Sequence, residues 1–284
     1  MPPSISSLTD RTPQMSGEEL AASLVPPRQF EQATLENYRP DPDFPSQAEA
    51  LEAARAFVAP RQSAGLFSRK KAPAAKPGLY LDGGFGVGKT HLLAALWKLA
   101  PGRKYFGTFI EYTALVGALG YQMVMTRLLG ELAEGGTRIA ATSNTPPNAL
   151  GEGRFAAADF LREIHALSAR FDIVRIDGLD YRRRDIEGHA RIFEAAEYAE
   201  ALARAEGPAT DDEFDAVLRH LSRVHPSRYV RLVEGLDVIG LRDVRTLHDQ
   251  SDALRFVALV DRIYDAQVPV VSTGVPLDQV FGKE

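Results

Sequence analysis

The sequence contains no cysteine, which excludes disulfide bonds, thiolate metal sites and cysteine nucleophiles together. It also has no uncharged apolar run approaching the ~20 residues that a membrane-spanning helix needs. The N-terminus "MPPSISSLTDRTPQMSGEEL" lacks the basic start and apolar stretch of a secretory signal. These absences predict a soluble, cytoplasmic protein with no transmembrane segment.

A large excess of charge of one sign is also absent, because the net charge is −5 at pH 7. No overall field would draw the protein onto nucleic acid or an anionic membrane. The exception is residues 61–77, "RQSAGLFSRKKAPAAKP", which carry basic side chains and no acid. This stretch is either a loop that contacts phosphates or nucleic acid, or a solvated linker. Its Ala, Pro and Ser content favours the linker, so nucleic-acid binding is not expected.

The N-terminal part, residues 1–77, is predicted to be a helical and extended segment that ends in this basic linker. Residues 1–14 are rich in Ser, Thr and Pro, and we expect them to be frayed. "SGEELAASL" predicts a short helix with Ser16 as N-cap and Glu19 at the capping-box position. A proline-rich extended stretch follows, and then a second helix capped by Ser46.

From Gly78 onward the pattern alternates between strands and helices, which predicts a parallel sheet with crossover helices over residues 78–182. The expected strands are 78–82, 104–112 (a strand or its approach), 137–144 and 172–177; the expected helices are 88–99, 111–121, 123–136 and 156–171. Residues 183–284 are predicted to form a C-terminal helical portion with returning strands. There we expect helices at 210–226 and 251–267, one or two strands within 229–244, and a strand at 268–274.

The first strand runs into "DGGFGVGKTHLL", and Gly83, Gly88, Lys89 and Thr90 satisfy the pattern G-x-x-x-x-G-K-[ST] between a predicted strand and a predicted helix. That context indicates a P-loop. The alternative is a glycine-rich turn with an incidental lysine, which we consider much the weaker interpretation. The predicted nucleotide-binding set is Gly83, Gly84, Phe85, Gly86, Val87, Gly88, Lys89, Thr90 and His91.

The chemistry of this loop follows from its glycines, which let successive backbone N–H groups curl inward around phosphate oxygens. The N-terminus of the following helix adds its positive dipole end. Lys89 is expected to reach the β- and γ-phosphates and the Thr90 hydroxyl to bind Mg²⁺. His91 is read mainly as a helix residue near the site. The predicted cofactors are therefore ATP and Mg²⁺.

Hydrolysis by P-loop ATPases also needs a carboxylate at the end of an apolar strand, often followed by Glu. No apolar run followed by Asp-Glu occurs in the sequence. "IVRID" ends in Asp177 but continues with Gly178. Asp177 is therefore a weaker candidate for the Mg²⁺ carboxylate, and the alternative, which we favour, is a structural strand end.

The ordered segments "DGGFGVGKTHLLAALW", "FGTFIEYTALVGALG", "IAATSNT", "LGEGRFAAADFLREI", "RIDGLDYR" and "LRFVALVDRIYDAQVPVVSTG" resemble the AFG-type (ZapE-like) AAA+ ATPases, with the actinobacterial branch closest in style. The resemblance covers roughly residues 18–281. It implies a P-loop NTPase of the AAA+ type, an α/β fold with a parallel sheet flanked by helices, an N-terminal extension and a C-terminal α+β portion. The P-loop alone is generic, whereas the ordered set of segments is specific.

The resemblance also implies roles for individual residues. Asn144 matches the sensor 1 position, where an amide orients the attacking water or contacts the γ-phosphate. Arg154 is the candidate for the arginine finger, although relatives carry that arginine at the position of Ala157, and Arg162 is a weaker alternative. Arg182 matches the family's D-Y-R run, and Arg255 matches the sensor 2 position or is a surface arginine. The predicted catalytic set is Lys89, Asn144 and Arg154.

The sequence departs from the family between "ALGYQ" and "MVMTRLLGELAEGG". Relatives carry there the Walker B strand, which ends in Asp-Glu. Either residues are missing from this sequence around Tyr121–Met123, or the chain carries a deletion that leaves a nucleotide binder without its catalytic acid. We favour the first explanation, because removing a central strand exposes the ladder groups of its neighbours.

The leading functional hypothesis is an ATPase that works as a homo-oligomer and remodels a protein client, for which the resemblance suggests the division apparatus or a membrane-associated protein. A nucleotide-gated binding module with little hydrolysis is the second hypothesis. The third is a DNA-linked loader, suggested by the basic loop and opposed by the acidic balance.

Overall fold

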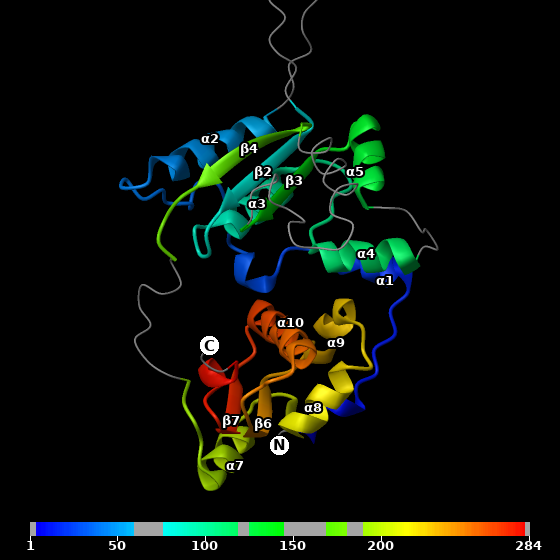
Figure 1. Cartoon of the computed structure of the whole chain (residues 1–284), viewed down its shortest axis with the longest axis vertical. Coiled ribbons are helices and arrows are strands. Elements are labelled where there is room, and N and C mark those ends of the chain that lie inside the picture. The colour runs from blue at the N-terminus through cyan, green and yellow to red at the C-terminus, as the bar shows by residue number, and fades with distance from the viewer. Residues whose placement is uncertain (1–3, 60–75, 119–124, 145–168, 181–189, 282–284) are drawn as a thin grey trace, which may run out of the picture. The chain divides into compact units, whose positions relative to one another are not determined.

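The computed structural model describes residues 4–59, 76–118, 125–144, 169–180 and 190–281. These residues form two compact units, each built on a parallel sheet with helices packed against it (Figure 1). The unit with the P-loop comprises residues 30–106 and 119–186, and the other unit comprises residues 1–29, 107–118 and 187–284. The α/β class expected from the sequence is confirmed. The sequence-based domain boundaries after residues 77 and 182 remain a prediction.

The sheet of the P-loop unit has the order β3-β2-β4 in the described residues, and both pairings are parallel. Its strands are β2 (Gly78–Gly83), β3 (Ile139–Ser143) and β4 (Phe171–Ile176). Asp82 is in register with Ser143 on one side, and Gly83 with Ile176 on the other. The carboxyl ends of the strands therefore meet at one edge, which is where ligands bind in open parallel sheets.

The helices of this unit are α2 (Pro45–Val58), α3 (Lys89–Leu99) and α5 (Met125–Glu134). Apolar side chains of α2 and α3 pack against those of β2 in one buried cluster, which includes Ala50, Leu79, Leu81 and Leu92. At about 25 cal/mol per Å² of buried apolar area, such packing is the main term that fixes β2. The loop that follows β2 therefore starts from a rigid position.

The second unit has a sheet of order β1-β5-β6-β7 in the described residues, again with parallel pairings. Its strands are β1 (Ile5–Ser6), β5 (Ala209–Glu213), β6 (Val238–Val244) and β7 (Val270–Gly274). Its helices are α1 (Gly17–Ala22), α4 (Phe109–Ala118), α7 (Ala195–Ala203), α8 (Phe214–Leu221), α9 (Tyr229–Val233) and α10 (Gln250–Ala266). The predicted helix at 251–267 and strand at 268–274 are confirmed.

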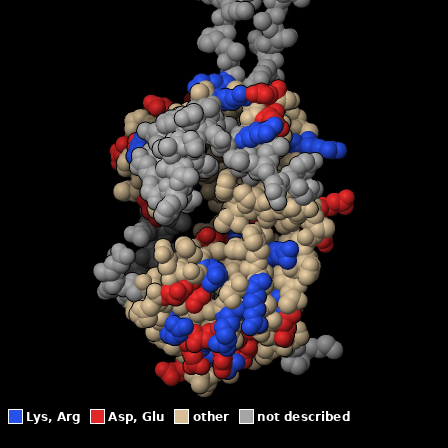
Figure 2. All heavy atoms as spheres, turned by 45° about the vertical axis from the view of Figure 1, so that its right-hand side comes forward, with Lys and Arg blue, Asp and Glu red and all other residues tan. Residues whose placement is uncertain are grey.

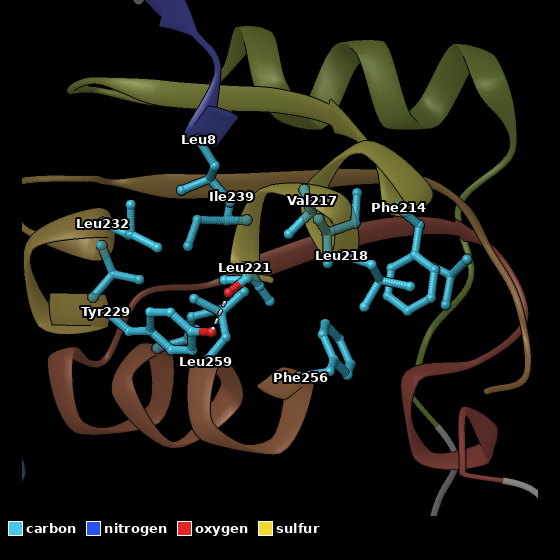
Figure 3. Packing of buried hydrophobic residues seen from close by; sticks show 14 of the residues in the cluster. Leu8, Phe214, Val217, Leu218, Leu221, Tyr229, Leu232, Ile239, Phe256 and Leu259 are labelled. Carbon is cyan, nitrogen blue, oxygen red and sulfur yellow. Dashed lines mark hydrogen bonds between the residues drawn. The ribbon is translucent and has the colours of Figure 1, made fainter. Parts of the chain in front are cut away.

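The core of the second unit lies between the sheet and helices α8, α9 and α10 (Figure 3). Phe214 and Phe256 meet edge to face with ring centroids 5.0 Å apart. Tyr229 is fully buried, and its hydroxyl donates a hydrogen bond to Leu221 O at 2.9 Å (Figure 3). The core therefore contains one buried phenol whose polar group is satisfied by the backbone.

The N-terminus corrects the expectation that residues 1–14 are frayed. Residues 5 and 6 pair with β5 as strand β1, and Leu8 is 1% exposed. Asp212 of β5 accepts hydrogen bonds from Leu8 N at 2.9 Å and from the Ser7 hydroxyl. A buried carboxylate therefore receives donors from the N-terminal segment, which holds that segment in place.

The segment 210–213, "TDDE", was predicted as the acidic first turn of a helix, but it forms strand β5, and the helix begins only at Phe214. The helix prediction was wrong because β5 lies between β1 and β6, where the backbone bonds of the ladder outweigh the low strand preference of Asp. Residues 229–233 are likewise helical rather than extended, so that this region supplies the single strand β6.

Residues 104–108 do not form the expected strand, and the helix α4 starts at Phe109. Thr108 and Glu111 explain the change, because Thr108 N and its hydroxyl donate to Glu111 Oε2 at 2.6 and 2.8 Å. This is capping-box chemistry, and it fixes the start of the helix. At Ser16 the predicted capping box is confirmed.

Ser46 does not cap α2, which starts at Pro45 after Phe44. Proline suits the first turn of a helix because it has no N–H to satisfy, and the Ser46 hydroxyl instead accepts a hydrogen bond from Asp177 N at 2.9 Å. The predicted helix at 156–171 and the basic stretch 61–77 lie mostly outside the described residues. In the described part of the chain, no helix combines the length and apolarity needed to cross a membrane.

Candidate nucleotide-binding site

The P-loop follows β2 and precedes α3, as the sequence predicts. Gly86 and Gly88 have φ of 65° and 86°, in the left-handed region that side chains rarely adopt. A Cβ at Gly88 would lie 2.5 Å from Tyr38 Cε2, and one at Gly86 would collide with the Asp180 carboxylate. The loop therefore has a tight curl that only glycine permits at these positions.

Lys89 lies inside this curl and is only 8% exposed. Its ammonium donates hydrogen bonds to Gly83 O at 2.8 Å and to Gly84 O. A third bond runs from Lys89 Nζ to Asn144 Oδ1 at 2.9 Å. The buried charge is thus held by oxygen acceptors from the loop and from the neighbouring strand, which offsets much of its desolvation cost.

Asn144 comes directly after β3, whose last residue Ser143 is in register with Asp82 of β2. The parallel pairing of β2 and β3 therefore explains why Asn144 reaches Lys89 across a gap of 55 positions in the chain. Two of the predicted catalytic residues are brought together.

The helix α3 begins at the end of the P-loop. Gly88 is its N-cap, and this N-cap makes no side-chain hydrogen bond to the first turn. The N–H groups of a first turn, together with the helix dipole, make an anion site. Thr90 is the second residue of the helix, at the place where its hydroxyl is expected to meet Mg²⁺. The loop shape, the uncapped helix and Lys89 together fit a polyphosphate.

The segment 34–47 packs against the back of the loop. The Tyr38 hydroxyl donates to Val87 O at 3.1 Å, and His91 Nε2 lies 2.9 Å from Thr34 O. The rings of Tyr38 and His91 are 5.6 Å apart and tilted. Burial raises the pKa of Tyr38 to about 12, so its hydroxyl remains a donor at neutral pH. His91 therefore ties the helix to this segment, and its predicted contact with nucleotide stays a prediction.

Gln47 joins the same segment to the residues after β4. Its side-chain amide donates to Asp177 O at 3.0 Å and accepts from Asp41 N at 2.9 Å. The Asp177 carboxylate itself accepts from Arg175 Nε at 2.9 Å. Asp177 therefore lies at the carboxyl edge of the sheet beside the P-loop, and its role toward Mg²⁺ stays a prediction.

A buried carboxylate lies just before the loop. Asp82 is 4% exposed, and its Oδ2 accepts from Arg175 Nη1 at 3.3 Å. Its Oδ1 has no hydrogen-bond partner in the part of the chain that the structure describes. No group of three or more Asp, Glu or His side chains arranged to hold a metal occurs in the described ranges. The Mg²⁺ role predicted for the Thr90 hydroxyl therefore stays a prediction, as does that of Asp177.

Several predicted site residues fall elsewhere. Arg154, Arg162 and Arg182 lie outside the described residues. Arg255 lies on α10 in the other unit, where its Nη1 donates to Asp252 Oδ1 at 3.3 Å on the same helix. The roles proposed for these arginines remain predictions.

The comparison with protein families decides the classification. The model of the AFG1-like ATPase family matches residues 15–116, 111–207 and 201–283. The chain belongs to this family. The resemblance read from the sequence segments is thereby confirmed, and so is the P-loop AAA+ fold class that it implied.

The chain is also similar to individual proteins of known name. The chain is 26% identical over 273 residues to the cell division protein ZapE of Escherichia coli K12, with 72% of each protein covered. It is 24% identical over 195 residues to lactation elevated protein 1 homolog B of Danio rerio, covering 56% of this chain and 38% of that protein. AMPPCP-bound DnaA from Aquifex aeolicus matches with 12% identity and a TM-score of 0.19, covering 89% of this chain and 45% of that one.

Sequence reasoning missed Tyr38, Gln47 and Asp82. Tyr38 and Gln47 lie in or next to a proline-rich stretch that was read only as extended chain or the start of a helix. Their contacts with Val87 and Asp177 span 49 and 130 positions. Local patterns do not report such long-range contacts. Asp82 carried a signal of its own, since a carboxylate inside an apolar strand is costly to bury without a partner and so points to a special role.

Proposed function

We propose that this protein binds MgATP in the P-loop, hydrolyses it and uses the cycle to remodel a protein partner in cell division. The observation that carries the proposal is the position of Lys89, which is buried in the loop and joined to Asn144. Membership of an ATPase family supports turnover. The name of the ZapE relative supports a division-linked client.

The residues of the chain have separate tasks in this proposal. The loop amides and the uncapped start of α3 bind and orient the phosphates. Lys89 exchanges some of its carbonyl contacts for phosphate oxygens, and Asn144 directs the attacking water or the γ-phosphate. Magnesium bound at Thr90 would neutralise charge that develops on the phosphate oxygens. Arg154 from a neighbouring copy would complete the site in a homo-oligomer.

A binding module with little hydrolysis is the alternative. It is favoured by the lack of an apolar run that ends in Asp-Glu and by the position of β3, which in the described residues is paired only with β2. In relatives, the Walker B strand lies between the segments that correspond here to α4 and α5. Loss of a positioned base slows reactions by about 10²- to 10⁴-fold, which is enough to turn a motor into a switch.

A DNA-linked loader has less support. On the face shown in Figure 2, basic and acidic side chains lie beside one another over the unit that contains α8 and α10. A mixed surface gives little of the counterion release that drives DNA binding.

Cytoplasmic localisation remains part of the proposal.

The test is steady-state phosphate release measured beside MgATP binding on the same preparation. The ATPase proposal predicts binding with turnover that saturates with ATP. Binding without turnover supports the switch instead. If neither binding nor turnover is seen, both are wrong.

A further inference from the structure

The backbone of the P-loop is held from outside by one side chain. The Tyr38 hydroxyl donates to Val87 O at 3.1 Å, and the Tyr38 ring lies against Gly88, where an added Cβ would be 2.5 Å from Cε2. Tyr38 is 8% exposed. It therefore contacts the loop at the peptide that joins Val87 to Gly88.

The contact with Tyr38 fixes the orientation of the peptide between Val87 and Gly88. A trans peptide is planar, and its C=O and N–H point in opposite directions. Fixing Val87 O toward Tyr38 therefore directs the Gly88 N–H away from Tyr38. Gly88 is the N-cap of α3, so this N–H belongs to the set that a P-loop presents to phosphate.

Tyr38 is itself positioned by a cross-bonded turn. Thr34 N donates to Asn37 Oδ1 at 2.8 Å, and Asn37 N donates to Thr34 Oγ1 at 3.1 Å. Asn37 Nδ2 also donates to Gln32 O at 2.7 Å. These bonds limit how far Tyr38 can move, which lowers the entropic cost of holding the loop in one shape.

We propose that Tyr38 is a positioning residue for phosphate binding, acting through the Val87–Gly88 peptide rather than through contact with the ligand. The inference rests on the proposed function and adds a residue outside the P-loop motif. It implies that removal of the hydroxyl alone weakens the binding of any polyphosphate, with or without a nucleoside.

The experiment compares Tyr38→Phe with Tyr229→Phe in the full chain. Tyr229 is the matched control, since its buried hydroxyl also donates to a backbone carbonyl, Leu221 O at 2.9 Å, but in the other unit (Figure 3). Burial raises the pKa of Tyr229 to about 12 as well. Calorimetry measures MgATP binding, competition measures inorganic tripolyphosphate binding, and thermal denaturation checks the fold.

Tyr38→Phe is expected to weaken both MgATP and tripolyphosphate by about three- to tenfold, the value of one hydrogen bond. Tyr229→Phe should leave both affinities unchanged while lowering the melting temperature to a similar extent. If Tyr38→Phe does not fold, Asn37→Ala, which loosens the turn, should weaken both ligands in the same way.

Unchanged tripolyphosphate binding in Tyr38→Phe overturns the inference, whether MgATP binding falls or not. A loss confined to MgATP would mean that Tyr38 contacts the nucleoside instead. These results would leave the proposed function standing. A wild-type protein that binds neither ligand would overturn both.

Discussion

Lys89 and Asn144 meet through a hydrogen bond from Nζ to Oδ1 at 2.9 Å, although they lie on different elements 55 positions apart. The contact links the lysine of the P-loop to the end of the neighbouring strand. Because the strands are parallel, both residues emerge at the carboxyl edge of the sheet. The hydrogen bond between Lys89 and Asn144 therefore depends on the pairing of β2 with β3, and not on the P-loop sequence alone.

Asn144→Ala is expected to keep MgATP binding within a few-fold and to lower turnover by roughly 100-fold. The amide would no longer direct the water or the γ-phosphate, while the loop would still bind phosphate. Asn144→Asp is expected to weaken binding instead, because a carboxylate beside Lys89 competes with phosphate. Steady-state phosphate release measures the turnover of both variants, and calorimetry measures their affinity for MgATP. Wild-type turnover in Asn144→Ala would contradict the assigned role.

Gly88→Ala is expected to destabilise the P-loop unit by about 1–3 kcal/mol, since it combines a left-handed φ with a collision against Tyr38. Gly84→Ala is the matched control, because a Cβ there meets nothing within 4 Å. Urea unfolding of the two variants gives the comparison. Equal stabilities would show that the curl of the loop does not depend on Gly88.

How much of this structure the sequence could predict depends on the range of the interactions involved. The P-loop, α3 and β3 were predicted because glycine spacing and apolar runs report local structure. Asn144 was placed through the family resemblance. β5 was missed because its acidic side chains are typical of a helix start, and only pairing with β1 and β6 overrides them.

The N-terminal strand and the support from Tyr38 could not be predicted for a related reason. Ile5 is in register with Ala209, more than half the chain away, and Tyr38 bonds to Val87. Nothing in the residues near Ile5 or Tyr38 indicates either partner. Such contacts become visible only when the three-dimensional structure is known.

Asp265 should make the stability of its unit depend on pH. Burial raises its pKa from 3.8 to about 6, against the opposing effect of Arg262. The folded state therefore binds the proton of Asp265 more tightly than the unfolded state does. The contribution of Asp265 to the free energy of unfolding thus falls as pH rises from about 4 to about 6. Replacement by Asn removes this dependence. The stability of Asp265→Asn relative to wild type should increase by about 1–3 kcal/mol across that range.

Chemical denaturation at several pH values between 4 and 6 measures this difference, using both proteins in the same buffers. Arg262 also contacts Glu111 Oε1 at 3.0 Å, so Asp265→Asn keeps one partner for the arginine. A difference that stays constant with pH would contradict the raised pKa.

The most direct test of the site is calorimetry with MgATP on wild type, Lys89→Ala and Lys104→Ala. Lys104 is the matched control, because it lies in the same unit and its ammonium also donates to backbone carbonyls, Lys98 O at 3.0 Å and Ala100 O at 3.2 Å. We predict binding heat for wild type and Lys104→Ala, and at least roughly 100-fold weaker binding for Lys89→Ala. Equal binding by wild type and Lys89→Ala, or none by wild type, would contradict the account.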